Sequence, residues 1–223
     1  ENIAADYFDV LDRMSEAKRK RFRDGEWAED AEGALWTTEG IDAFRIKPQH
    51  IPQLSRVVVA VDPSGTAGGE EASNDDVGIV VAGLGIDGRW YVLADYTCNL
   101  SPSGWARRAI DAYHDFQADR IVAETNYGGA MVKAVIRSVD AHVPFREVKA
   151  SRGKVARAEP ISALYDEGKV SHAGSFPDLE DQMCAMTSAG FIGEGSPDRA
   201  DALVWAITDL SAKPAKRAGI RSL

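Results

Sequence analysis

Cysteine is scarce in this sequence: Cys98 and Cys184 are its two cysteines among 223 residues. They form no Cys-x-x-Cys motif and have no histidine cluster nearby, which argues against a zinc site and favours a reducing cytoplasm. No apolar stretch approaches the ~20 residues that a membrane-spanning helix needs. No signal peptide is recognisable either. We therefore expect no membrane segment.

Positive charge is in deficit, with a net charge of −9 at pH 7. Such a chain is not a general binder of polyanions. An acidic total still allows DNA binding, because binding depends on local basic patches and on carboxylates that metal ions mask. The chain begins with Glu1 rather than methionine, already in an amphipathic pattern, and we interpret it as a piece of a longer protein.

Three carboxylates stand at positions that a metal site would need. Asp62 ends the apolar run 57–62, and Glu124 ends the apolar run 121–124. Acids at the ends of such runs lie at the carboxyl edge of a buried sheet, where α/β folds bind ligands. Asp201 lies near the start of a predicted helix over 197–211. Two strands and one helix can bring the three together, where Mg²⁺ or Mn²⁺ would relieve their repulsion.

Hydrophobic periodicity predicts an α/β fold with a mixed five-stranded sheet flanked by helices. We expect three segments: a linker region at 1–54 that includes a helix over 4–23, an α/β domain at 55–212, and a basic tail at 213–223. The remaining expected elements are strands at 57–62, 77–84, 89–96, 120–124 and 145–149, and helices at about 103–117, 129–139, 154–167, 177–187 and 197–211.

Four motifs in this order resemble the ribonuclease H-like superfamily, and within it the C-terminal nuclease domain of a large terminase subunit from a tailed phage or gene transfer agent. The motifs are Val61-Asp62-Pro63-Ser64-Gly65, Ala123 to Gly129, Lys149 to Val170, and Asp198-Arg199-Ala200-Asp201-Ala202. Upstream, Arg21 to Thr37 resembles the segment that joins the packaging ATPase to the nuclease. The ATPase itself is absent from this chain, since no G-x-x-x-x-G-K-[ST] motif occurs.

The resemblance implies a metal-dependent endonuclease that cuts concatemeric double-stranded DNA during genome packaging, with low sequence specificity. Asp62, Glu124 and Asp201 match the family's metal-binding acids, with Asp62 bridging two Mg²⁺ or Mn²⁺ ions. Asp198 lies one helical turn before Asp201 and is a further candidate ligand. The implied partners are DNA, the N-terminal ATPase domain of the same polypeptide, the portal protein and the small terminase subunit. The implied location is the cytoplasm of the bacterial host.

Each acid also has a purely structural interpretation. Asp62 could cap a turn, and Glu124 could cap the helix that follows it. Asp198 suits the first turn of a helix because of the helix dipole. That explanation fits Asp201 less well, since Asp201 is one turn further in and is flanked by alanines and leucine.

A run of basic residues lies beside the predicted metal site. Lys149, Arg152, Lys154 and Arg157 are candidates to hold the phosphates that flank a scissile bond. The alternative is a solvated helix face.

Two other functions remain open. Val61 to Thr66 before a hairpin also resembles the phosphate loop of the actin and sugar-kinase fold, which would require a second, similar domain. An inactive scaffold that only grips DNA or a portal ring is the other alternative, and the intact acids argue against it.

Overall fold

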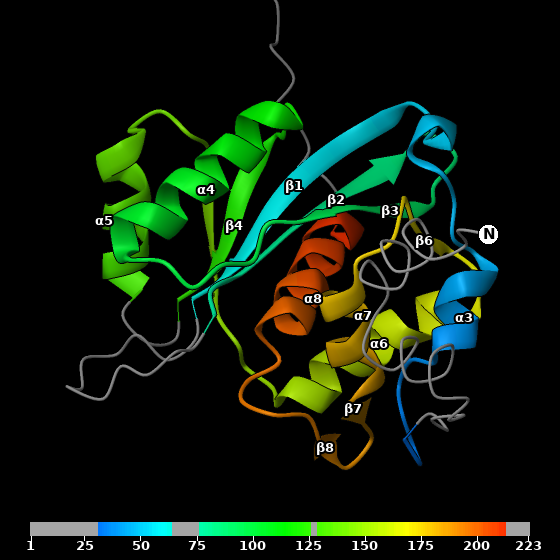
Figure 1. Cartoon of the computed structure of the whole chain (residues 1–223). Coiled ribbons are helices and arrows are strands. Elements are labelled where there is room, and N and C mark those ends of the chain that lie inside the picture. Colours follow the sequence, from blue (N-terminus) through cyan, green and yellow to red (C-terminus); the bar gives the residue numbers. More distant parts are fainter. Residues whose placement is uncertain (1–30, 64–75, 126–128, 213–223) are drawn as a thin grey trace, which may run out of the picture.

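The apolar run that ends at Asp62 forms the central strand of a six-stranded sheet (Figure 1). The computed structural model describes residues 31–63, 76–125 and 129–212. Within these residues, the strands are β1 (Leu54–Asp62), β2 (Gly78–Gly85), β3 (Trp90–Asp95), β4 (Arg120–Glu124), β5 (Phe145–Val148) and β6 (Val170–His172). Their order across the sheet is β5-β4-β1-β2-β3-β6.

The sheet mixes parallel and antiparallel pairs. Consecutive strands β1, β2 and β3 are antiparallel, while β4 pairs parallel to β1, β5 to β4, and β6 to β3. The expected mixed sheet is therefore confirmed. The sheet has one strand more than we expected, because β6 is a three-residue edge strand, too short for a period-two pattern to reveal it.

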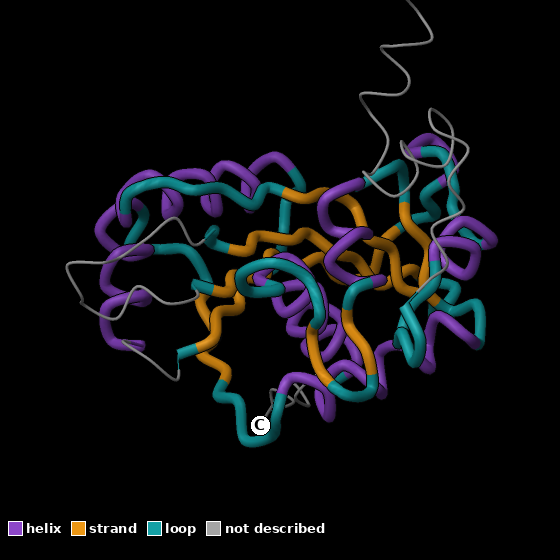
Figure 2. Tube along the Cα trace, turned by 60° about the horizontal axis from the view of Figure 1, so that its bottom comes forward, coloured by secondary structure: helices purple, strands orange, loops and turns teal. Residues whose placement is uncertain are grey.

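Helices cover both faces of the sheet (Figures 1 and 2). They are α4 (Pro102–Asp115) and α5 (Gly129–Val139) on one face, and α6 (Lys154–Asp166), α7 (Pro177–Cys184) and α8 (Asp198–Ser211) on the other. Side chains that alternate along β1 point to the two opposite helical layers. Val57, Val59 and Val61 pack in the core beneath α4 and α5, whereas Val58 and Ala60 pack against α8. Both faces of β1 are buried, as a near-continuous apolar run predicts.

The segment before β1 packs onto the domain. It contains the short helix α3 (Thr38–Ala43) and the 3-10 helix η1 (Pro48–His50). Trp36 is buried and lies edge-on to Tyr165, with ring centroids 6.1 Å apart. Ile46 forms a bridge with Ala173, beside β6. The division at residue 54 stays a prediction.

A buried ion-pair network fastens the same segment. Arg45 donates to Glu180 on α7, at 2.6 and 2.9 Å, and Glu180 also accepts from the backbone N–H of Phe176. His172 Nδ1 lies 3.0 Å from Glu180 Oε1, and its Nε2 lies 2.8 Å from the hydroxyl of Tyr165. Burial lowers the pKa of His172, in spite of the opposing hydrogen bond with Glu180. This histidine therefore serves the fold.

A small hairpin completes the described fold. Strands β7 (Met186–Thr187) and β8 (Gly190–Phe191) form a separate hairpin that bridges to Ala34. No helix within the described residues is long and apolar enough to cross a membrane. The predicted helix over 4–23 and the basic tail at 213–223 lie outside the described residues.

Candidate active site

Asp62 and Glu124 end two neighbouring parallel strands at the same edge of the sheet. The register pairs Val61 with Ala123, so the two acids that follow are next to each other. Side chains alternate along a strand. Because Val58, Ala60 and Val122 face α8, Asp62 and Glu124 face it as well. The strand register thus aims both predicted acids at the same helix.

Helix α8 brings the other two acids to this edge. It begins at Asp198, and Asp198 and Asp201 lie in its first turn, both about 2% exposed. The close approach of α8 depends on Gly78, which pairs with Asp62 in the antiparallel register. A Cβ at Gly78 would lie 2.5 Å from the carbonyl carbon of Asp198 and closer still to its oxygen. The absence of a side chain at Gly78 therefore lets the helix start beside Asp62.

The charges of the four carboxylates act on one another. Burial raises the pKa of Asp62 well above its usual range, and the charges of Asp201, Glu124 and Asp198 raise it further. Burial also raises the pKa of Asp201, although Lys154 and Arg157 oppose this and Glu124 adds to it. Like charges held this close destabilise their ionised forms. A divalent cation bound among them would remove that penalty.

Two cations from α6 lie against these acids. Arg157 donates to Glu124 Oε2 at 2.8 Å and to Asp201 Oδ1 at 3.2 Å. Lys154 Nζ lies 2.6 Å from Asp201 Oδ2 and donates to Ser196 at 3.1 Å. Of the four predicted DNA-binding residues, these two therefore contact predicted metal ligands. Lys149 and Arg152 lie on the connection between β5 and α6, and both are exposed.

The donor set suits a hard divalent cation. Asp62, Glu124, Asp198 and Asp201 offer carboxylate oxygens, which Mg²⁺ and Mn²⁺ prefer. As the side chains stand, no three acidic, histidine or cysteine residues among those described are grouped to hold one ion. The guanidinium of Arg157 instead bridges Glu124 and Asp201, and so supplies positive charge between two of the acids. The residues fit a metal, provided that these cations move aside.

Trp205 was not predicted as part of the site. Its indole Nε1 donates to Glu124 Oε2 at 2.7 Å, and Arg157 lies over its ring, 4.8 Å from the centroid. Trp205 follows Asp201 by four residues, and a helix places such residues on one face. That spacing was a usable signal. For Gly78 we find no comparable signal in the sequence.

Arg199 joins the start of α8 to the ends of β2 and β3. It pairs with Asp76 at 2.8 Å, with Asp95 at 3.1 Å and with Asp178 at 3.5 Å. Asp76, which lies just before β2, is thus tied to the start of α8 through Arg199. Asp75 lies outside the described residues.

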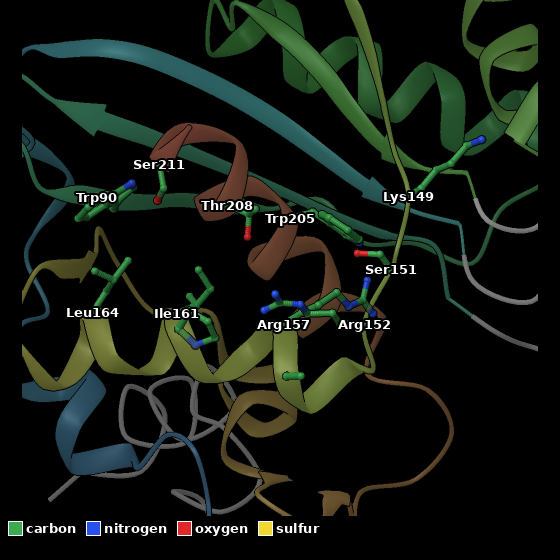
Figure 3. Close-up of a pocket in the computed structure, with 12 residues that line it drawn as sticks. Trp90, Lys149, Ser151, Arg152, Arg157, Ile161, Leu164, Trp205, Thr208 and Ser211 are labelled. Atoms are coloured by element: carbon green, nitrogen blue, oxygen red, sulfur yellow. The ribbon is translucent and has the colours of Figure 1, made fainter. Parts of the chain in front are cut away.

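A groove of about 540 Å³ opens between α6 and α8 (Figure 3). Arg152, Arg157 and Ser151 line one end, where Trp205 also lies. Trp90, Ile161 and Leu164 give the other end an apolar lining. Arg157 and Trp205 therefore belong to both the groove wall and the acidic cluster.

Known proteins of one kind share this architecture. The sequence model of a terminase RNaseH-like domain matches residues 59–210. No curated protein is detectably similar to the chain in sequence.

Solved structures agree with the family match. The nuclease domain of the large terminase subunit gp2 of bacterial virus Sf6 matches with a TM-score of 0.62 and 14% identity, covering 82% of this chain and 100% of that one. The HK97 bacteriophage large terminase matches with a TM-score of 0.61 and 14% identity, and the match covers 79% of this chain and 43% of that one. The human cytomegalovirus terminase nuclease domain matches with a TM-score of 0.57 and 16% identity, and the match covers 79% of this chain and 95% of that one. At these identities the likeness establishes the fold.

Proposed function

The chain belongs to the terminase RNaseH-like domain family, and we propose that it is a divalent-metal-dependent endonuclease that cuts double-stranded DNA during viral genome packaging. One observation carries the proposal. Asp62 and Glu124 end neighbouring parallel strands, and Arg157 bonds to both Glu124 and Asp201, so carboxylates from β1, β4 and α8 converge on one place. Clustered carboxylates are costly without a counter-charge, so a metal site is a physical reason for them.

Asp62, Glu124 and Asp201 would hold the metal, and Asp198 would contribute a fourth carboxylate from the same turn as Asp201. Two bound Mg²⁺ or Mn²⁺ ions would supply an activated water and stabilise the leaving oxygen of a phosphodiester. Trp205 fixes the orientation of Glu124 through its Oε2 atom. Lys149 and Arg152, beside the site, would hold the phosphates that flank the scissile bond.

Relatives support the use of divalent metal. Sf6 gp2 nuclease structures were solved with manganese and with calcium, in a K428A mutant of that protein. The cytomegalovirus nuclease domain was solved after soaking in manganese. The carboxylate oxygens of Asp62, Glu124 and Asp201 in this chain are likewise donors that suit Mg²⁺ or Mn²⁺.

The substrate that fits this setting is concatemeric DNA, cut with little sequence preference. The basic residues beside the site suit phosphate contacts, which carry no sequence information. The chain matches 43% of the HK97 large terminase. This supports a packaging ATPase domain elsewhere in the same polypeptide, with the portal protein and small terminase subunit as further partners in the bacterial cytoplasm.

The kinase alternative lacks support from the fold. An actin-like or sugar-kinase fold needs a second, similar domain, and the described residues form one six-stranded sheet and one small hairpin. The inactive-scaffold alternative predicts DNA binding without cleavage, and the following experiment distinguishes it from the proposed nuclease.

Supercoiled plasmid incubated with the chain and Mn²⁺ should be nicked and linearised, and EDTA should stop the reaction. Asp62→Asn, Glu124→Gln and Asp201→Asn should each abolish cleavage while the domain stays folded. Asp111→Asn, an exposed acid on α4, is the matched control and should cut like the wild type. Wild-type nicking by one of the three variants would remove that residue from the site. DNA binding without cleavage by the wild type would favour the scaffold.

A further inference from the structure

Arg157 joins two of the proposed metal ligands. Its side chain is about 11% exposed, and its guanidinium bonds to Glu124 Oε2 at 2.8 Å and to Asp201 Oδ1 at 3.2 Å. Its cation also lies over the ring of Trp205, which donates to the same oxygen of Glu124. The two acids are thus held together by a charge that belongs to the protein.

In this arrangement, Arg157 occupies oxygen atoms that a metal ion would bind. Glu124 Oε2 and Asp201 Oδ1 accept from the guanidinium, and the second oxygen of Asp201 lies 2.6 Å from Lys154 Nζ. A divalent cation that takes these oxygens must displace the hydrogen-bonded cations. It must also share a small volume with them, and like charges repel. Metal binding therefore includes the cost of breaking the Arg157 bridge.

A phosphate bound in the groove would be another partner for the displaced guanidinium. Arg157 lines the groove near Arg152 and Ser151 (Figure 3), and it also bonds to Glu124 and Asp201. Arginine binds phosphate oxygens with two parallel hydrogen bonds, as it binds carboxylates. A phosphate at this end of the groove would offer Arg157 bonds that replace those to Glu124 and Asp201.

We propose that Arg157 competes with divalent metal for Glu124 and Asp201, and that a DNA phosphate in the groove between α6 and α8 relieves this competition. The inference rests on the proposed function and adds a property to it: DNA and metal bind cooperatively through one side chain. Thermodynamic linkage makes the coupling reciprocal, so DNA raises the affinity for metal by the factor by which metal raises the affinity for DNA. Arg157 is thus a positioning residue, and the site assembles on its substrate.

The first test is Mn²⁺ binding without DNA, measured by isothermal titration calorimetry on the full chain. Arg157→Ala and Arg157→Gln should each bind Mn²⁺ about 5-fold more tightly or better, since typical coupling factors begin there. Gln keeps a donor for Glu124 without the charge, which guards against a collapse of the site. Arg107→Ala, at an exposed arginine of α4 on the other face of the sheet, should match the wild type. Thermal unfolding shows that each variant is folded.

Unchanged or weaker Mn²⁺ binding by both Arg157 variants would overturn the inference and leave Arg157 as a support for Glu124. If the wild type binds Mn²⁺ and cuts DNA, that outcome leaves the proposed function intact. If neither the wild type nor the variants bind Mn²⁺, the proposed function fails together with the inference.

The second test adds a short DNA duplex at saturating concentration, after subtraction of the Mn²⁺ that the duplex binds alone. DNA should tighten Mn²⁺ binding to the wild type about 5-fold or more. In Arg157→Gln this factor should fall toward one, because the competitor is already gone. Equal tightening in the wild type and the Gln variant would overturn the role of the groove phosphate.

Discussion

Replacing Gly78 by alanine should displace the helix that carries half of the acids. The new Cβ would lie 2.5 Å from the carbonyl carbon of Asp198. Carbon atoms in contact usually lie about 3.5–4.0 Å apart, so the start of α8 would have to retreat by roughly 1 Å. The obstacle is backbone, which cannot rotate away. We expect a loss of stability of about 1–3 kcal/mol, typical of overpacking. A shift of about 1 Å in a catalytic group costs on the order of 10²-fold in rate.

The assay is plasmid cleavage in Mn²⁺, with thermal unfolding beside it. Gly83→Ala is the matched control, on the same strand. Its Cβ would meet the end of the Leu54 side chain at 2.8 Å, and that side chain can move. Gly78→Ala should remain folded and lose about 10²-fold in cleavage rate, while Gly83→Ala should cut normally. Cleavage by Gly78→Ala at the wild-type rate would refute the argument that this close approach positions Asp198 and Asp201.

Three further outcomes are expected. Asp198→Asn should reduce plasmid cleavage less than Asp201→Asn, because the helix dipole role of Asp198 tolerates a neutral amide better than metal ligation does; equal reductions would make Asp198 a full ligand. Lys149→Ala combined with Arg152→Ala should flatten the salt dependence of DNA binding, by a slope of about 0.9 for each phosphate that the protein no longer neutralises, and an unchanged slope would make these residues a solvated face. Burial alone would raise the pKa of Glu180, but hydrogen bonds from His172 and Arg45 outweigh it and lower that pKa to about 2. This lowered pKa contributes about 3 kcal/mol to the free energy of unfolding. The contribution is fully present above pH 4.5, the ordinary pKa of a glutamate, and is lost as the pH falls through about 2. Glu180→Gln should therefore flatten the fall in Tm across that window, and an unchanged pH profile would contradict the role of the network.

The strand-borne part of the site was predictable from sequence. A β-branched run that ends in an acid specifies a buried strand and places the acid at its carboxyl edge, which is how Asp62 and Glu124 could be located. The register that makes them neighbours follows from the parallel pairing of β1 and β4. These features depend on local pattern and on a general rule of α/β folds.

Interactions across the fold were not predictable in the same way. In the sequence, Arg157 is one member of a basic run, and its bridge to Glu124 and Asp201 arises from the packing of α6 beside α8. Gly78 looks like an ordinary strand glycine until α8 is in place. Strand β6 escapes detection because three residues carry too little periodicity. In each case the deciding partner lies far away in the chain.

The central claim is that Asp62, Glu124 and Asp201 bind divalent metal together. The most direct test is a crystal of this chain soaked in Mn²⁺, with anomalous scattering recorded from the metal. We predict an anomalous peak among these three carboxylates, at metal–oxygen distances of about 2.0–2.2 Å, with the Arg157 guanidinium moved away from Glu124. Full-strength diffraction with no peak there, or with Arg157 still bridging Glu124 and Asp201 at saturating Mn²⁺, would contradict the account.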